Sequence, residues 1–385
     1  MMTYMKVLLA ILLNFLLAGV YAQSEQCLVD RYADVALFDS SEVVVYENIM
    51  YGNATNLFNN VDTDLYVDVW CPDPSIDELE ARPLVVLIHG GSFQGGSRDD
   101  MNFYCMELAR RGFVAATVSY RLGWGCDPNA GVLTCLACGP LANNLPTAAY
   151  NAVQDAHAAV RYLVVNAAQY GIDQNWVFTG GVSAGAITAL GLAFTSQQDA
   201  NTYLPVPVAA AGNIAESGNE LVADFSIKGV MNNCGAVFNT AMISAGEDIP
   251  VISFHDDGDC VVPYGNGRVL SCLGCTAFPF VSGSSIINNH LNSLGICSEL
   301  NTRQLSLLHC GWPTMNAIKR TSCFFKRIMC GVCTSSGNSD INVSSPCSVL
   351  GIEEQVTCAS DLNGDGLVNS GDLLILLSEY GTSCQ

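Results

Sequence analysis

Positive charge is scarce in this chain: 15 Lys and Arg residues stand against 36 Asp and Glu residues, which gives a formal net charge of −21 over 385 residues. An acidic chain without a basic patch repels phosphate, which argues against nucleic acids and anionic lipid surfaces as partners. Charged residues of both signs make up only 13% of the chain, whereas half of it is apolar. We therefore expect a large buried core beneath an acidic, solvated surface.

Long apolar runs are missing beyond the N-terminus. The one such run spans Val7–Val20, with Lys6 as the only charge before it and Ala22 as a small residue at a cleavage point. This pattern predicts a secretory signal peptide over residues 1–22. We expect a secreted protein, extracellular or on the cell surface, with no transmembrane segment after cleavage. An uncleaved anchor is the alternative, although the run is short for a membrane span.

Cysteine, in contrast, is abundant: the chain has 18 cysteines, and all follow the predicted signal peptide. An even number in an exported protein predicts disulfide bonds. C-x-x-C spacing, which also occurs in zinc sites, is found in three pairs: Cys135/Cys138, Cys272/Cys275 and Cys330/Cys333. Export favours disulfides over zinc, but the pairing cannot be derived from the sequence.

Apolar runs typical of buried strands alternate with helical patterns between about residue 43 and residue 330. Continuous runs such as Pro83–Ile88 and Phe113–Ser119 predict strands that are buried on both faces. A long helix is expected over Ala148–Tyr170, and Leu305–Leu308 is interpreted as a last short strand. The alternation predicts an α/β fold with a mostly parallel, doubly wound sheet and helices on both faces.

Composition divides the chain into four parts. Residues 1–22 form the signal peptide and residues 23–330 the α/β domain. Residues 331–357, rich in Ser, Gly, Asn and Cys, are interpreted as a linker tethered by disulfides. Residues 358–385 are expected to form a small calcium-binding module.

The sequence Gly181–Gly185 reads G-x-S-x-G and lies between a predicted strand and a predicted helix of small residues. Such a turn places Ser183 at a strained apex above the sheet, with the helix N-terminus beneath it. His89, Gly90 and Gly91 directly follow the strand at 83–88, where backbone N–H groups can form an oxyanion hole together with the N–H of Ala184. Each motif alone could be a coincidence in a chain with 35 glycines, but together they predict a site for acyl transfer.

A serine nucleophile needs a base, and the base needs an orienting carboxylate. In this architecture the acid precedes the histidine in the chain. Asp256, Asp257 and Asp259 compete for the role of the acid, and Asp259 is preferred because it precedes Val-Val-Pro-Tyr. Of the histidines beyond it, His290 lies in a predicted helix, so His309 is favoured as the base.

These motifs resemble the α/β-hydrolase esterases and lipases with an HGG oxyanion motif, the carboxylesterase and hormone-sensitive-lipase-like group. The resemblance covers residues from about 43 to 330 and is carried by six segments: Leu65–Trp70, His89–Phe93, Val118–Leu122, Asp155–Leu163, Tyr170–Asp173 and Gly181–Gly185. It implies an α/β-hydrolase fold and a secreted serine esterase with Ser183, Asp259 and His309 as its triad. It also supports Asp259 over its neighbours, and the chemistry needs no cofactor.

Two features depart from that family's pattern. Ser92 replaces the third glycine of HGGG relatives, which leaves open whether Gly90 or Gly91 joins Ala184 in the oxyanion hole. Residues 122–147 and 265–285 resemble Cys-bearing insertions that can line or cover the substrate pocket. Ester substrates could therefore be acyl or feruloyl groups on polysaccharide, lipid-like esters or polyesters. A serine peptidase of the same fold and a non-catalytic binding protein on a hydrolase scaffold are the alternatives.

The C-terminal segment carries a calcium-loop pattern, with a glycine at loop position 6. The oxygen ligands would come from five residues: Asp361, Asn363, Asp365, Leu367 through its carbonyl, and Asp372. This predicts a structural Ca²⁺ ion, with a plain polar turn as the alternative. Residues 361–380 resemble one repeat of a type I dockerin, whereas dockerins carry two. The resemblance implies attachment to a protein partner or cell surface, or a calcium-stabilised cap.

Overall fold

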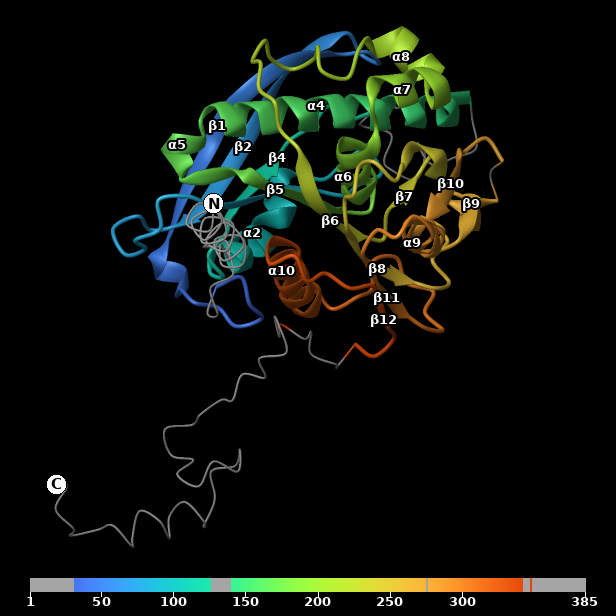
Figure 1. Cartoon of the computed structure of the whole chain (residues 1–385). Helices are drawn as coiled ribbons and strands as arrows, with labels where there is room; N and C mark the ends of the chain where they lie inside the picture. Colours follow the sequence, from blue (N-terminus) through green and yellow to red (C-terminus); the bar gives the residue numbers. More distant parts are fainter. Residues whose placement is uncertain (1–30, 126–139, 275, 342–346, 348–385) are drawn as a thin grey trace, which may run out of the picture. The chain divides into compact units, whose positions relative to one another are not determined.

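The computed structural model of the chain describes residues 31–125, 140–274, 276–341 and 347 (Figure 1). The chain divides into two units, Met1–Ser345 and Pro346–Gln385, and every helix and strand named below belongs to the first. The predicted signal peptide and calcium loop lie outside the described residues. No helix within the described ranges is both long enough and apolar enough to span a membrane.

The elements of the first unit are as follows. The strands are β1 (Val43–Asn56), β2 (Val61–Pro72), β3 (Arg82–Ile88), β4 (Val114–Val118), β5 (Ile172–Val182), β6 (Ile227–Asn233), β7 (Ala236–Val237), β8 (Val251–Asp256), β9 (Asn266–Arg268), β10 (Phe280–Gly283), β11 (Ser298–Arg303) and β12 (Ser336–Asn338). The α-helices are α2 (Asn102–Ala109), α4 (Leu145–Val165), α5 (Ala167–Tyr170), α6 (Ala184–Phe194), α7 (Gln197–Tyr203), α8 (Pro205–Ala211), α9 (Ser284–Ser293) and α10 (Thr314–Met329). Short 3-10 helices are η2 (Ser40–Glu42), η3 (Arg98–Met101), η5 (Pro140–Asn144), η6 (Thr240–Met242) and η7 (Ser271–Leu273).

The main sheet of the described residues has nine strands in the order β1-β2-β4-β3-β5-β6-β8-β11-β12. The pairs β1/β2 and β2/β4 are antiparallel, and every pair from β4 to β12 is parallel. A second, three-stranded sheet has the order β7-β10-β9. The predicted α/β fold with a mostly parallel sheet is confirmed, and the order is that of an α/β-hydrolase fold.

Two separate cores cover the two faces of the main sheet. Alternate residues of β3 supply both: Leu84 faces the core with α4 and α6, whereas Val85 faces the core with α2 and α10. Figure 1 shows α4 and α6 on one side of the strands, and α2 and α10 on the other. Because both faces are covered, β3 is entirely buried, which explains its continuous apolar sequence.

The helix expected over residues 148–170 is broken into α4 and α5. The break falls at Asn166, whose side chain donates to the Tyr162 carbonyl at 2.8 Å and whose backbone leaves the helical region. The predicted end at Gly171 is confirmed, because this glycine caps α5 in the left-handed conformation with φ +63°.

The prediction of a strand over Leu305–Leu308 is wrong. These residues form an open loop, and the side chains of Leu305 and Leu307 are 98% and 83% exposed. The last long strand is instead β11, whose sequence SELNTR is polar. Its Glu299 is buried between Arg320 and Arg327 of α10, so charge pairing replaces the apolar side chains that the prediction relied on.

The segment interpreted as a linker begins with structure that the sequence did not reveal. Residues 336–338 form β12, which pairs in parallel with β11 at the sheet edge. Cys333 in the same segment is bonded to Cys297. A disulfide bond therefore ties the start of this segment to the residue before β11, while most of residues 342–357 lie outside the described residues.

Disulfide bonds also join Cys234 to Cys310 and Cys260 to Cys272. Cys272 and Cys333, which belong to two of the C-x-x-C pairs, each take part in a disulfide bond. Their partners lie outside the C-x-x-C pairs, so that spacing does not give the connectivity.

Candidate active site

Ser183 lies at the junction of β5 and α6. Its backbone has φ +56° and ψ −119°, a conformation that costs energy for a residue other than glycine. The turn is so tight that a Cβ atom at Gly185 would lie 2.0 Å from the carbonyl oxygen of Ile88 at the end of β3. The glycine is required because the backbones of the helix and the neighbouring strand touch there. The strained turn lifts the serine side chain above the carboxyl ends of the parallel strands.

His309 connects Ser183 to Asp259. Its Nε2 lies 2.8 Å from the Ser183 Oγ, and its Nδ1 lies 2.7 Å from the Asp259 Oδ2. With Nδ1 donating to the carboxylate, Nε2 is left as the acceptor for the serine proton. The serine and the aspartate are both buried, with 8% and 6% of their surface exposed. The three predicted catalytic residues thus form one hydrogen-bonded chain, although they are 50 to 126 positions apart.

The Asp259 carboxylate is held in its ionised form. Its Oδ1 accepts hydrogen bonds from the backbone N–H groups of Val261 at 2.8 Å and Val262 at 3.2 Å. Burial alone would raise the pKa of Asp259, but hydrogen bonds and charge interactions with His255 and His309 outweigh it and lower the pKa to about 2. The group therefore stays negative at any pH near neutrality and can stabilise a cation on His309.

His255 is a second imidazole at this carboxylate, which the sequence analysis did not single out. It is fully buried, and its Nε2 lies 3.0 Å from the Val262 carbonyl and 3.4 Å from the Asp259 Oδ2. A carbonyl can only accept, so Nε2 carries the proton and Nδ1 accepts from the Ser284 hydroxyl at 2.7 Å. The sequence signal that could have revealed this histidine is its position near the end of a predicted strand, four residues before the predicted acid.

The two competing aspartates hold the loop that carries His309. Asp257 accepts from the backbone N–H groups of Leu305 at 3.0 Å and Ser306 at 3.1 Å. Asp256 accepts from the N–H of Gly311 at 2.6 Å. Asp257 binds the loop backbone before His309, and Asp256 binds it after His309. Both aspartates therefore support the loop, and Asp259 is the one that contacts the imidazole.

A disulfide bond fixes the same loop from a third direction. Cys310, next to His309, is bonded to Cys234, which directly follows β6. The Cys310 Sγ lies 3.4 Å from the His309 Nε2. Both sulfur atoms belong to the disulfide, so this cluster of Cys234, His309 and Cys310 offers no thiolate to a metal ion.

The glycine-rich loop after β3 lies against the serine. A Cβ atom at Gly90 would be 3.3 Å from the Ser183 Cβ, and Gly91 adopts φ +113°, where side chains are disfavoured. Among the described residues, neither the Gly91 N–H nor the Ala184 N–H donates to another protein group. The Gly90 N–H likewise donates to no protein group among the described residues, so Gly90 or Gly91 can join Ala184 in holding a developing oxyanion.

Two aromatic residues that sequence reasoning missed hold this loop in place. The Tyr120 hydroxyl donates to the His89 carbonyl at 3.0 Å, and its ring stacks on the His89 imidazole with centroids 4.4 Å apart. The Trp124 indole N–H donates to the Ser92 carbonyl at 3.1 Å. Tyr120 lies in Val118–Leu122, one of the segments that carry the family resemblance, but the sequence of that segment does not predict its contact with His89.

A hollow of about 310 Å³, part of it open to solvent, adjoins Ser183. Its other walls are mostly apolar: Ser92, Phe93, Leu145, Ala184, Ile187, Val261, Val262, Val269 and Leu270. Val269 and Leu270 come from the segment 265–285, so that expected insertion does line the site.

His290, the other histidine considered as the base, is not brought to the site. The Nε2 of His290 lies 3.0 Å from the Ile243 carbonyl, and the ring is part of α9 as predicted. The calcium-loop residues, Asp361 to Asp372, lie outside the described residues, so that prediction stays untested.

Residues 45–224 match the model of the Carboxylesterase family. Fumonisin B1 esterase of Sphingopyxis macrogoltabida is 31% identical over 173 residues, which cover 42% of this chain and 30% of that protein. Secreted lipase 5 of Gibberella zeae is 28% identical over 210 residues, 53% of this chain and 35% of the lipase. The chain thus spans about a third of the length of these curated relatives, and the family match ends before Asp259 and His309.

Among solved structures, a truncated carbohydrate esterase from gut microbiota is 16% identical, with a TM-score of 0.47 over 77% of this chain and 99% of that chain. At such values the assignment of the fold depends on the strand order and on the turn at Ser183.

Proposed function

We propose that this chain is a secreted serine esterase that hydrolyses carboxylic esters through an acyl-enzyme intermediate. The observation that carries the proposal is the position of His309, within hydrogen-bonding distance of both Ser183 and Asp259. The family match over residues 45–224 supports the same chemistry. Acyl or feruloyl groups on polysaccharide, lipid-like esters and polyesters are the substrate classes we propose to screen.

The reaction would take two steps. The Ser183 Oγ forms a bond to the ester carbonyl carbon while its proton passes to the His309 Nε2. The carbonyl oxygen takes the negative charge beside the N–H groups of Ala184 and of Gly90 or Gly91. The bond to the alcohol oxygen then breaks, and His309 returns the proton to that oxygen. Water attacks the acyl-enzyme in the same way, giving its proton to His309, which returns it to Ser183 as the acid leaves.

The test is the variant Ser183→Ala on p-nitrophenyl esters, with Ser293→Ala, an exposed serine of α9, as the matched control. We expect kcat to fall by about a million-fold in Ser183→Ala and to stay unchanged in the control. A fluorophosphonate probe should label the wild type and the control but not Ser183→Ala. Retained turnover in Ser183→Ala would rule out the proposed mechanism.

The same experiment separates the two alternatives. A serine peptidase of this fold would cleave a panel of peptide amides in preference to the esters. A binding protein on a hydrolase scaffold would neither turn over esters nor react with the probe.

We further propose that Asp361, Asn363, Asp365, Leu367 and Asp372 bind a structural Ca²⁺ ion that plays no part in the ester chemistry. Calcium should raise the melting temperature of the full chain, and Asp365→Ala should remove that effect without changing ester turnover. The module could serve attachment to a protein partner or cell surface.

A further inference from the structure

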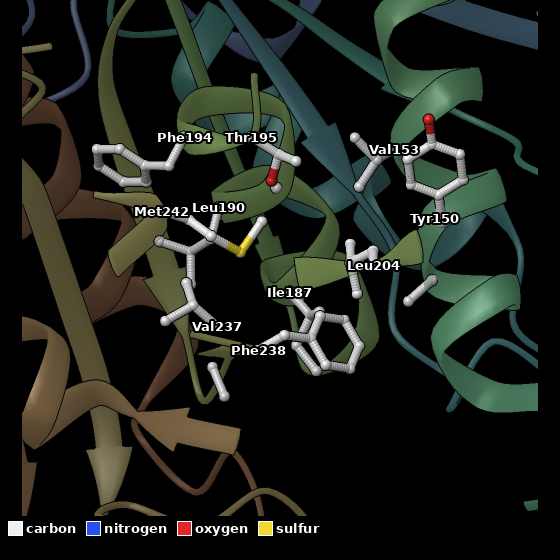
Figure 2. Close-up of a pocket in the computed structure, with 13 residues that line it drawn as sticks. Tyr150, Val153, Ile187, Leu190, Phe194, Thr195, Leu204, Val237, Phe238 and Met242 are labelled. Carbon is white, nitrogen blue, oxygen red and sulfur yellow. The ribbon is translucent and has the colours of Figure 1, made fainter. Parts of the chain in front are cut away.

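A second apolar hollow lies further along α6 from Ser183 (Figure 2). It encloses about 430 Å³ between its lining atoms, including the part that opens to solvent. Figure 2 shows Leu190 and Met242 on one side of it, Val153 and Leu204 on the other, and Ile187 with Phe238 at one end.

The two hollows share the side chain of Ile187 as a common wall, and together they are called the trough between α4 and α6. Among the described residues, Ile187 is the one side chain that lines both. It follows Ser183 by one helical turn, and its N–H donates to the Ser183 carbonyl at 3.0 Å. On α4, Leu145 lines the hollow at the serine, and Val153, two turns on, lines the second. The second hollow therefore begins roughly 6 Å beyond the serine, from the rise of 1.5 Å per helical residue.

The trough lies on the acyl side of the reacting ester. The leaving alcohol oxygen must face the His309 Nε2 to receive its proton, and His309 does not line the hollow at Ser183. The acyl group, which stays bonded to Ser183, is left to occupy that hollow. A longer acyl group has to continue past Ile187.

The lining chemistry selects an aliphatic chain. No charged side chain among the described residues lines either hollow. The Tyr150 hydroxyl donates to the Gly212 carbonyl at 2.9 Å and points away from the centre of the hollow in Figure 2. The width depends on Gly191, where a Cβ atom would lie 2.5 Å from the Val153 Cγ2. A sugar or a second carboxylate would find too few polar partners there.

We propose that the hollow between α4 and α6 binds the acyl chain of a medium-chain aliphatic ester, and that Ile187 is the specificity residue over which the chain passes. This inference rests on the proposed esterase activity and names the substrate class of the same site. Each methylene buried in the trough should raise kcat/KM by about fourfold, from the ordinary transfer free energy of a methylene.

The experiment compares p-nitrophenyl acetate, butyrate, hexanoate, octanoate and decanoate. We expect kcat/KM of the wild type to rise from acetate to octanoate. Ile187→Phe, which narrows the passage, should lower the octanoate-to-acetate ratio at least about tenfold, and Ile187→Ala should shift the optimum toward decanoate. Gly191→Val, which fills the far hollow, should also lower the ratio. Loss of stability alone cannot move the ratio in both directions.

Ile318→Ala is the matched control, because Ile318 is also buried but packs in the core with α10 on the opposite sheet face. Its chain-length profile should equal that of the wild type. A profile that does not change in any Ile187 or Gly191 variant overturns the inference and leaves the esterase activity intact.

A binding measurement keeps the two proposals apart. Octanoate should bind to Ser183→Ala protein by calorimetry, and adding Ile187→Phe should weaken that binding at least about tenfold. If no ester is hydrolysed but octanoate binds in this way, the esterase proposal fails and the apolar site stands. If esters are hydrolysed and octanoate binds equally to both proteins, the apolar site fails.

Discussion

The nucleophile and its proton acceptor are held in place by different means. The nucleophile region, residues 82–233, fixes Ser183 through backbone contacts: a strained φ, a glycine pressed on Ile88 and a second glycine loop at the serine. The base region, residues 251–338, fixes His309 through side chains and covalent bonds. Two aspartates bind its loop, and a disulfide joins the neighbouring Cys310 to Cys234, the residue after β6.

The difference between the two regions indicates which parts of such an active site can change in sequence. Backbone contacts between a strand, a tight turn and a helix tolerate few residues, and most of the nucleophile region falls within the family match. A loop held by individual bonds can change its length and composition as long as some set of bonds replaces the old one. The loop that carries His309 is held in this second way, by separate hydrogen bonds and a disulfide.

The largest expected effect is at Asp259. Asp259→Asn should lower kcat/KM by about a thousand- to ten-thousand-fold, because the amide favours the wrong His309 tautomer and cannot stabilise the imidazolium. Asp256→Asn and Asp257→Asn are matched controls of the same size. Both side chains accept from the backbone of the His309 loop, and Asp256 also faces the Arg303 guanidinium at 3.9 Å. We expect losses of about tenfold or less from them. The measurement is kcat/KM on p-nitrophenyl butyrate, with circular dichroism to verify folding.

The opposite order of the kcat/KM losses would contradict this assignment. If Asp256→Asn or Asp257→Asn lost more activity than Asp259→Asn, that aspartate would be the triad acid and Asp259 would only support the loop.

An intermediate effect is expected from the disulfide at His309. Replacing Cys234 and Cys310 by alanine should lower kcat/KM about ten- to a hundred-fold, because a freed loop must be ordered again for each turnover. The control replaces Cys297 and Cys333, whose bond lies near the amino ends of β11 and β12, away from the triad. Both pairs should lower the melting temperature, but only the first should lower kcat/KM at a temperature where both proteins are folded. Equal activity losses would show that the disulfide serves stability alone.

The sequence predicted the nucleophile region well for a physical reason. A parallel strand covered on both faces must be apolar, so β3 and β4 stand out, and the glycines of a tight strand-to-helix turn cannot be replaced. The position of Ser183 therefore follows from local sequence. The contacts of Tyr120 and Trp124 with the oxyanion loop do not, because they depend on tertiary packing.

The base region was predicted only in part. His309 was placed beside the right serine but through a wrong strand: Leu305 and Leu307 are exposed, whereas β11 is polar because Glu299 is buried with two arginines. An apolar pattern cannot reveal a strand whose burial depends on ion pairs with a distant helix. The choice among three aspartates likewise required the fold, since each ends up bonded to a different part of one loop.

The smallest expected effect is on the free energy of unfolding at acidic pH. The two regions should lose stability over different pH ranges. Burial lowers the pKa of His157, on α4 in the nucleophile region, to about 4 from 6.5. Between those values the unfolded chain binds a proton that the folded chain does not, so stability falls as the pH decreases. The loss should be roughly 1 to 2 kcal/mol between about pH 7 and pH 5. Asp259, with its pKa lowered to about 2 from 3.8, keeps its contribution in that range and loses it only below about pH 4.

Urea unfolding of His157→Phe at several pH values tests this difference. The ring of His157 lies 5.6 Å from that of Phe225, so an aromatic replacement keeps the packing and removes the titrating group. The variant should lose less stability than the wild type between about pH 7 and pH 5. If His157→Phe loses as much as the wild type, acid sensitivity comes from another group, and the two regions do not differ in the way proposed.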